Sequence, residues 1–195
     1  RLQPTVGTRY SASFEWAGGA LGGTTDFLRQ RVNFTRYQPI TKTGLRTVAA
    51  VNVEAGAIEP LSGSDLFFFD RFYLGGENSV RGFRFRSLWA RDEFGNTIVD
   101  QFGVPIGGDR FGRANLEGIL LLGGPFRLIG FFDMGGVWVS EQEISFDTMR
   151  YSAGVELQVN VPLFGAPLRF IYSENLDPFP DDRFETFQFS IGPSF

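Results

Sequence analysis

The sequence predicts an all-β fold: a transmembrane antiparallel β-barrel of about eight strands, forming one domain over residues 1–195. Apolar and polar residues alternate with a period of two, over segments long enough for a tilted strand to cross a bilayer. No apolar run approaches the roughly 18 residues that a membrane-spanning helix needs. Aromatic residues make up 16% of the chain and glycine accounts for 25 residues, a composition that suits strands, membrane-interface girdles and turns.

The first expected strand, from Val6 to Trp16, sets this pattern. Mostly apolar side chains occupy every second position, and glycine, serine, arginine and glutamate stand between them. A half-buried strand of a soluble sandwich alternates in the same way, so the length of the segment is what discriminates. A barrel strand needs roughly 9 to 11 residues to cross the membrane, whereas strands of soluble proteins average about 5 to 6. The first segment has the length of a barrel strand.

Seven further segments show the same alternation. They are residues 27–37, 47–58, 113–122, 126–139, 149–162, 167–174 and 184–195. Some connections between them are short and rich in glycine, as at 123–125 and 164–166, and others are long and polar, as at 38–46, 140–148 and 175–183. Short and long connections alternate in the later part of the chain. This asymmetry is typical of an outer-membrane barrel, which has short periplasmic turns and long outer loops.

One connection, from Glu59 to about Gly112, is much longer than the others and lacks a clean strand period. Unstructured loops above about 12 to 15 residues are uncommon, and are usually functional or disordered. This segment does not have a disordered composition, since it contains three consecutive phenylalanines and several other aromatic residues. We therefore expect it to pack against the rest of the fold.

The composition excludes several classes of function. The chain has no cysteine and no histidine, which removes disulfides, thiolate metal sites and the commonest general base. No nucleophile motif such as G-x-S-x-G is present, so we expect no enzyme, cofactor or metal. The net charge of −4 provides no basic field for nucleic acid. Because the chain starts at Arg1, with neither an initiator methionine nor a signal peptide, we expect a processed or excised segment of an exported protein.

A motif inside the long connection suggests a family. The string FYLGGENSVRGF at residues 72–83, with Val80, Arg81, Gly82 and Phe83 at its centre, closely resembles the signature of the BamA/TamA-type outer-membrane protein assembly factor superfamily.

Three further matches follow in the family's order. They are Asn115-Leu116-Glu117, then the F-x-D-x-G string at residues 131–135, and a last strand that ends in Phe195 with Phe187, Phe189 and Ile191 at alternate positions before it. Each match is weak alone, but the four in order are strong, and the resemblance runs over nearly the whole chain.

The resemblance implies roles for these residues. In the family the signature loop folds back into the barrel lumen, and its arginine is held by acidic residues of the inner wall, which here would pair Arg81 with Glu117 and Asp133. On spacing alone, the three charges could equally be independent and solvated. The two carboxylates alone would also suit glycosidase chemistry, but the resemblance gives them a structural role. Other charged residues of the polar faces, among them Glu156 and Arg169, are expected to line the lumen without a specific role.

The resemblance also implies a place and a function. The match covers the C-terminal half of a sixteen-stranded family barrel without its periplasmic POTRA domains, so the chain looks like a fragment or short relative of a factor that inserts and folds β-barrel proteins. It is expected in the bacterial outer membrane, with outer-membrane lipids and, in the full-length protein, nascent outer-membrane proteins as partners. The last strand would supply an insertion signal and one side of the family's seam. The other side would lie upstream of Arg1, so the isolated chain is not expected to insert client barrels.

Two alternatives to the assembly factor remain open. One is a polypeptide-transport pore of the two-partner secretion type, which shares the loop signature. The other is a small structural barrel without transport activity.

How eight strands would close is a separate question. An eight-stranded barrel has an interior just wide enough for side chains, without room for a loop of about fifty residues. Two copies joined edge to edge, a homodimer through edge strands, would enclose both loops and remove the exposed edges. Closure of one chain on itself avoids the entropy of association and is the arrangement we favour. In that arrangement the loop is expelled, and Arg81 lies away from Glu117 and Asp133.

Overall fold

A computed structural model describes residues 4–18, 25–41, 44–61, 66–140, 142–161 and 165–193. Eight strands form one antiparallel sheet in which each strand pairs with the next in sequence. The strands are β1 (Gly7–Ala17), β2 (Phe27–Pro39), β3 (Arg46–Pro60), β4 (Arg110–Gly123), β5 (Phe126–Trp138), β6 (Arg150–Asn160), β7 (Pro167–Asn175) and β8 (Phe187–Ile191). Among these described residues, no helix is long and apolar enough to cross a membrane.

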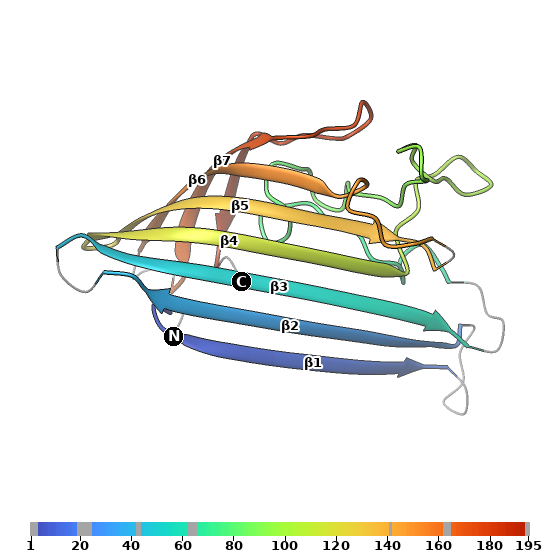
Figure 1. Ribbon diagram of the computed structural model, residues 1–195, viewed down its shortest axis with the longest axis horizontal. Coiled ribbons are helices and arrows are strands. Elements are labelled where there is room, and N and C mark those ends of the chain that lie inside the picture. The colour runs from blue at the N-terminus through green and yellow to red at the C-terminus, as the bar shows by residue number, and fades with distance from the viewer. Residues whose placement is uncertain are drawn as a thin grey trace.

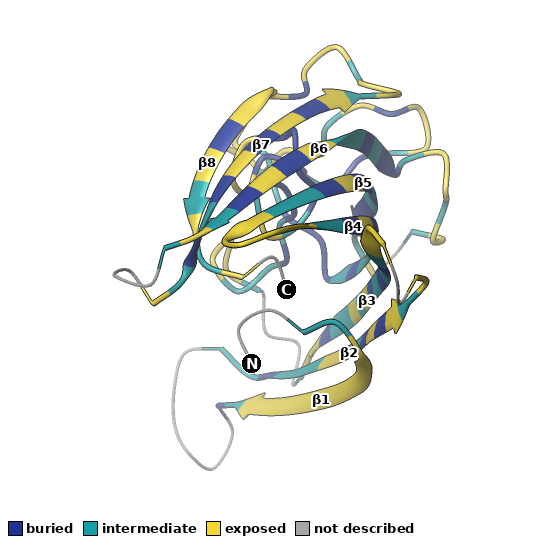
Figure 2. Cartoon of the chain, turned by 90° about the vertical axis from the view of Figure 1, so that its left-hand side faces the viewer, coloured by how far each residue is buried: buried dark blue, intermediate teal, exposed yellow. Residues whose placement is uncertain are grey.

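The sheet bends into an open trough, and the strands follow one another along its curve from β1 to β8 (Figure 2). Few residues separate β2 from β3, β4 from β5 and β6 from β7, and these three connections lie at one end of the trough. The longer connections lie at the other end, and the segment from 66 to 109 folds back along the concave side (Figure 1). The polar connection expected at 38–46 is shorter than predicted, because β2 and β3 extend until only residues 40–45 remain between them.

Burial in this sheet is the reverse of that in a soluble protein. Along β6, Ser152 and Glu156 on the concave face are completely buried, whereas Val155 and Leu157 on the convex face are 50% and 37% exposed. Strands β7 and β8 repeat the pattern, with Arg169 and Gln188 buried inside and Phe170 and Phe187 exposed outside. The concave face of β3 to β5 also carries buried apolar side chains, among them Ile58, Phe111 and Ile129, and the long loop packs on the first two. An apolar outer face over a polar interior is the arrangement of a sheet that faces lipid.

The prediction that one chain closes on itself is wrong. Strands β1 and β8 lie at opposite ends of the sheet and do not pair with each other. The reason is the long loop, whose Phe72, Val80 and Phe83 pack in one apolar cluster with Ile58 and Phe111 of the concave face. Closing eight strands would expel these side chains into water, since such a barrel has no room for a loop.

The predicted strand positions agree closely with the observed ones, except at the C-terminus. The last strand was expected over 184–195 but is confined to β8, because Phe184 forms an isolated bridge with Phe83 of the loop. Phe195 lies outside the described residues.

Candidate functional site

The signature segment forms a compact turn whose shape depends on glycine. The N–H of Gly76 donates to the carbonyl of Phe83 at 3.0 Å, which closes the turn around Arg81. Gly82 has a φ of 89°, in the left-handed region that favours glycine. A Cβ there would lie 2.6 Å from Oδ1 of Asn175, on β7. Glycine at this position therefore lets the loop backbone approach the wall.

Arg81 is 2% exposed and lies at the centre of a network on the concave face. Its Nε and Nη2 donate to the two carboxylate oxygens of Asp133 at 2.7 and 2.8 Å. Its Nη1 donates to Glu117 at 2.8 Å and to Glu156 at 3.0 Å. These three carboxylates come from β5, β4 and β6, so one loop arginine ties together three consecutive strands. The guanidinium carbon also lies 3.7 Å from the centre of the Phe131 ring.

Two of the three carboxylate partners of Arg81 were predicted from the sequence, and the third was not. Glu117 and Asp133 are the two carboxylates named from the sequence, and the loop is not expelled. Glu156 was assigned no role, because its alternation pattern indicates only that it faces inward. Although burial disfavours a charged guanidinium, attraction to Asp133 and then to Glu117 and Glu156 raises the pKa of Arg81, so this residue stays charged.

A second buried arginine, Arg169 of β7, completes this network. It binds Glu156 in a bidentate pair, with Nε–Oε1 and Nη2–Oε2 distances of 2.7 and 3.0 Å. It also donates to Oδ1 of Asn78 at 2.7 Å and to the carbonyl of Glu77 at 3.0 Å, both in the signature loop. We call Arg81, Glu117, Asp133, Glu156 and Arg169 the inner lock. It holds three carboxylates against two guanidinium groups.

Side chains of the wall also bind the backbone of the signature loop. Asn115 of β4 donates to the carbonyl of Ser79 at 2.7 Å. On the other side, Gln188 of β8 accepts from the N–H of Gly82 and donates to the carbonyl of Phe83, both at 3.2 Å. Val80 and Phe83 are completely buried. The loop is therefore anchored through both its side chains and its backbone.

The C-terminal residues named from the sequence lie elsewhere. Phe187, Phe189 and Ile191 are more than half exposed on the convex face, where the Phe189 ring lies 5.2 Å from that of Phe170. Gln188 between them points inward to the loop. The structure thus separates the predicted site residues into an inner group around Arg81 and an outer apolar stripe on β8.

A second cluster of buried charges lies at the long-loop end, and the sequence analysis missed it. Arg91 of the long loop and Arg150 of β6 both bind Asp182, each at 2.8 Å. The Phe179 ring lies 4.6 Å from the Arg91 guanidinium and 3.7 Å from that of Arg150. Arg91 also pairs with Asp181 at 2.7 Å. We call these five residues the cap cluster. Arg91, Arg150 and the segment 179–182 come from three distant parts of the chain and share no period, so no local signal could have identified their contact.

Asp181 is the most exposed charge of the cap cluster. Partial burial works against its ionised form, but the Thr97 hydroxyl and the Arg91 guanidinium, which both bind it, hold the pKa of Asp181 below its ordinary value.

Comparison with known proteins identifies the family. Residues 1–195 match the sequence profile described as the Omp85 superfamily domain. "Outer membrane protein assembly factor BamA" of Nitratidesulfovibrio vulgaris is 34% identical over 200 residues, covering 99% of this chain and 24% of that protein. The protein of the same description from Neisseria meningitidis serogroup B is 29% identical over 197 residues, covering 84% of this chain and 23% of that protein.

The fold is also similar to a solved structure. The crystal structure of BamA from Haemophilus ducreyi lacking POTRA domains 1–3 matches 95% of this chain and 38% of that chain, with a TM-score of 0.77 and 23% identity. At that identity the match shows likeness of fold alone. The present chain spans about a quarter of the length of the curated relatives it matches.

Proposed function

Because this chain belongs to the Omp85 superfamily, we propose that it forms part of the wall of an assembly factor that inserts and folds β-barrel proteins in the bacterial outer membrane. In this proposal the convex face contacts outer-membrane lipids, and nascent outer-membrane proteins are the clients of the full-length protein. The observation that carries the proposal is the inner lock, in which Arg81 of the signature loop binds carboxylates of three successive strands.

The geometry of the inner lock supports a positioning role instead of catalysis. The guanidinium of Arg81 makes four hydrogen bonds to carboxylates and is shielded from solvent. A buried arginine with its donors engaged fixes a loop in place, but it offers no group to a reacting substrate. We therefore expect the protein to act without enzymatic chemistry, with Arg81 maintaining the shape of the wall.

The test is an insertion assay with the full-length protein in liposomes. A small outer-membrane barrel is added unfolded in urea, and its folding is followed by protection from protease. We expect faster folding than in protein-free liposomes, and slower folding with Arg81→Ala. The matched control is Arg84→Ala, in the same loop, whose side chain is exposed and has no bonded partner among the described residues. Equal folding with and without the protein would refute the proposal.

A polypeptide-transport pore and a small structural barrel are the alternatives. Conductance across planar bilayers separates the pore from the assembly factor. Since the long loop packs against the concave face, we expect no steady ion channel from the full-length protein. Reproducible open channels that persist in the Arg84→Ala control would favour the pore.

The two free edges of the sheet leave a question of assembly. Strands β1 and β8 each pair on one side only within the described sheet, and unpaired edges attract further strands. We propose that further strands of the same protein or a second copy pair with them. The mass of the particle in detergent decides between the two, since two chains per particle would establish the homodimer.

A further inference from the structure

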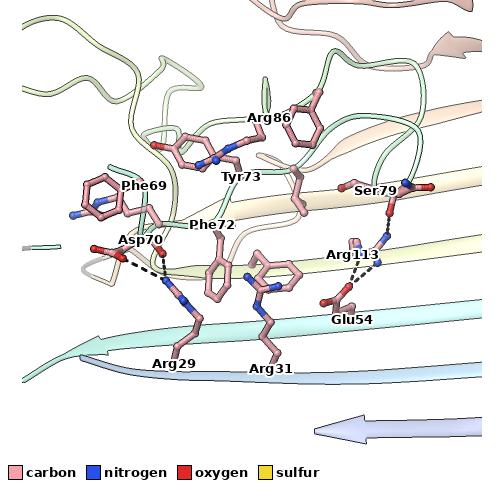
Figure 3. A pocket seen from close by; sticks show the side chains of 15 residues that line it. Arg29, Arg31, Glu54, Phe69, Asp70, Phe72, Tyr73, Ser79, Arg86 and Arg113 are labelled. Atoms are coloured by element: carbon pink, nitrogen blue, oxygen red, sulfur yellow. Dashed lines mark hydrogen bonds and ion pairs between the residues drawn. The ribbon is translucent and has the colours of Figure 1, made fainter. Parts of the chain in front are cut away.

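A cavity of about 350 Å³ lies beside the inner lock, between the concave face of β2 to β4 and the long loop. Five arginines line it, against two carboxylates, Glu54 and Asp70. The arginines are Arg29 and Arg31 of β2, Arg71 and Arg86 of the loop, and Arg113 of β4. Figure 3 shows Arg29, Arg31 and Arg113 extending from the strands and Arg86 lying on the loop side. The lining is therefore rich in arginine in a chain whose net charge is −4.

Three of the five arginines are matched by carboxylates. Arg113 binds Glu54 at 2.6 Å, Arg29 binds Glu15 at 2.6 Å, and Arg71 binds Asp109. The first two pairs each join neighbouring strands, and the third joins the two ends of the long loop. These arginines therefore hold the walls of the cavity together, and the geometry around them already suits carboxylate groups.

The other two arginines, Arg31 and Arg86, have no hydrogen bond or ion pair among the described residues. Each instead stacks on an aromatic ring of the loop, Arg31 at 4.9 Å from the Phe72 centroid and Arg86 at 4.4 Å from that of Tyr73. Figure 3 shows the two guanidinium groups beside these neighbouring rings. An aromatic ring attracts the cation but offers no hydrogen-bond acceptor oxygen, so the N–H groups of both guanidinium groups remain able to bind an anion.

Two further features favour a binding site over two idle surface charges. Arg86 has a φ of 55°, and it is the non-glycine residue with positive φ in the described part of the chain. A residue in this unfavourable backbone conformation is more often found at a functional site than elsewhere. In addition, Nε of Arg29 is buried and has no hydrogen-bond partner among the described residues. The cavity thus presents unused donors from both of its sides.

We propose that this cavity binds an acidic segment of polypeptide, whose carboxylates pair with Arg31 and Arg86 while its apolar atoms rest on Phe72 and Tyr73. The inference deepens the proposed function, because it names the chemistry of the client segment that the lumen receives. Carboxylate is the favoured anion, since the three neighbouring arginines each bind one. The aromatic floor fits the apolar part of a peptide better than a fully hydrated small anion.

The test is a binding measurement that does not depend on insertion. A fluorescent peptide with two aspartates next to a phenylalanine is titrated with the full-length protein in uncharged detergent, and anisotropy is read. A second peptide carries asparagine in place of aspartate. We expect the acidic peptide to bind at least about tenfold more tightly, and its binding to weaken as salt is added.

The variant that tests the site is Arg31→Gln combined with Arg86→Gln, which keeps side-chain length and removes both charges. We expect a loss of about tenfold or more in affinity for the acidic peptide. Arg84→Gln removes one charge from the same loop outside the cavity and should leave binding unchanged. Equal binding of the two peptides, or an unaffected double variant, would overturn the proposal.

Inorganic phosphate distinguishes the class of anion. At matched ionic strength, phosphate should displace the acidic peptide only weakly. If phosphate displaces the fluorescent peptide at a lower concentration than the unlabelled acidic peptide does, the cavity binds a phosphate group instead. The insertion assay tests the proposed function independently of this site. If the protein binds the acidic peptide but has no insertion activity, the proposed function is contradicted and the peptide site is not.

Discussion

The inner lock and the cap cluster are built from the same parts but connect different elements. Each places a buried arginine against an aromatic ring and binds it to carboxylates. In the inner lock all three carboxylates project from strands, so the loop is bound to the wall. In the cap cluster Asp181 and Asp182 belong to the connection between β7 and β8, so one loop is bound to another loop and to the start of β6. Around Arg81 the long loop is therefore bound mainly to the strands, with a further bridge from Phe83 to Phe184 of the β7–β8 connection. Around Arg91 it is bound mainly to that connection.

The balance of charge differs as well. The inner lock has three carboxylates for two arginines, and Oε2 of Glu117 has no hydrogen-bond partner among the described residues. The cap cluster has two carboxylates for two arginines, and 48% of the Asp181 side chain is exposed. Removing a cation from the buried, acidic inner lock should therefore lower the free energy of unfolding more than removing a charge from the more exposed cap cluster.

The largest effect is expected from Arg81→Ala. The substitution leaves three buried carboxylates with Arg169 as their remaining cation, and breaking a buried pair in this way costs roughly 3 to 5 kcal/mol. Urea unfolding of the full-length protein in detergent, followed by tryptophan fluorescence, measures the loss. Arg84→Ala in the same loop should change the free energy of unfolding by less than about 0.5 kcal/mol. A similar loss in both variants would show that the inner lock does not stabilise the fold.

A smaller and more local effect is expected from Asp182→Asn in the cap cluster. The aspartate serves Arg91, Arg150 and the backbone N–H of Phe179 together. Loss of its charge should cost about 1 to 3 kcal/mol and loosen residues 177–183 without disturbing the signature loop.

Hydrogen exchange of the Asp182→Asn variant measures whether the loosening stays local. Exchange should quicken at residues 91–95 and 177–183 and stay unchanged at 79–83. Asp177→Asn, at an exposed aspartate of the same connection, is the matched control. Faster exchange at residues 79–83 as well as 91–95 would mean that these two parts of the long loop open together.

Gly82→Ala tests how closely the loop must approach the wall. Alanine at a φ of 89° costs about 1 to 2 kcal/mol from backbone strain alone, and its Cβ would also collide with Asn175. Gly103→Ala provides the strain without the collision, since φ is 77° there and no atom lies within 4 Å of the added carbon. We expect Gly82→Ala to lower the urea midpoint more than Gly103→Ala does. Equal shifts would mean that the close approach has no energetic importance.

The smallest effect concerns pH. The pKa of Asp181 is lower in the folded protein than its ordinary value of 3.8, so its contact with Arg91 contributes fully above pH 3.8 and is lost as pH falls through the lower folded value. Its exposure limits the size of this contribution. Pepsin cleavage within residues 177–183 should accelerate as the pH is lowered from about 5 to about 2. Asp181→Asn should remove that acceleration, beyond the pH dependence of pepsin itself on an unstructured peptide.

The sequence predicts the wall better than the networks that cross it. Period-two alternation locates the strands because a sheet with lipid on one side and a polar interior on the other imposes that period on every strand. The pairing of Arg81 with Glu117 and Asp133 was accessible through the family motif. Glu156 and Arg169 were placed on the inner face without a role, since alternation says which way a side chain points and not which charge it meets.

The cap cluster and the open edge were beyond the reach of sequence patterns. Arg91 and Asp182 lie 91 positions apart in two aperiodic connections. The closure prediction is wrong because it rested on the entropy of association that one chain avoids. It left out the apolar cluster around Phe72 and Phe83, which closure would break up. That cluster depends on the path of the loop, which no local pattern reveals.

The inner lock has a consequence for the order in which the chain can assemble. Glu117, Asp133 and Glu156 lie 36, 52 and 75 residues after Arg81, and each belongs to a strand that follows the loop. A hairpin of β4 and β5 that entered hydrocarbon alone would carry Glu117 and Asp133 without Arg81, the cation that they bind, which is a costly intermediate. Such distant contacts also form slowly, because a long stretch of chain must be ordered first. The signature loop therefore has to dock while β4, β5 and β6 are still in contact with water. These strands then enter the membrane together and not one by one.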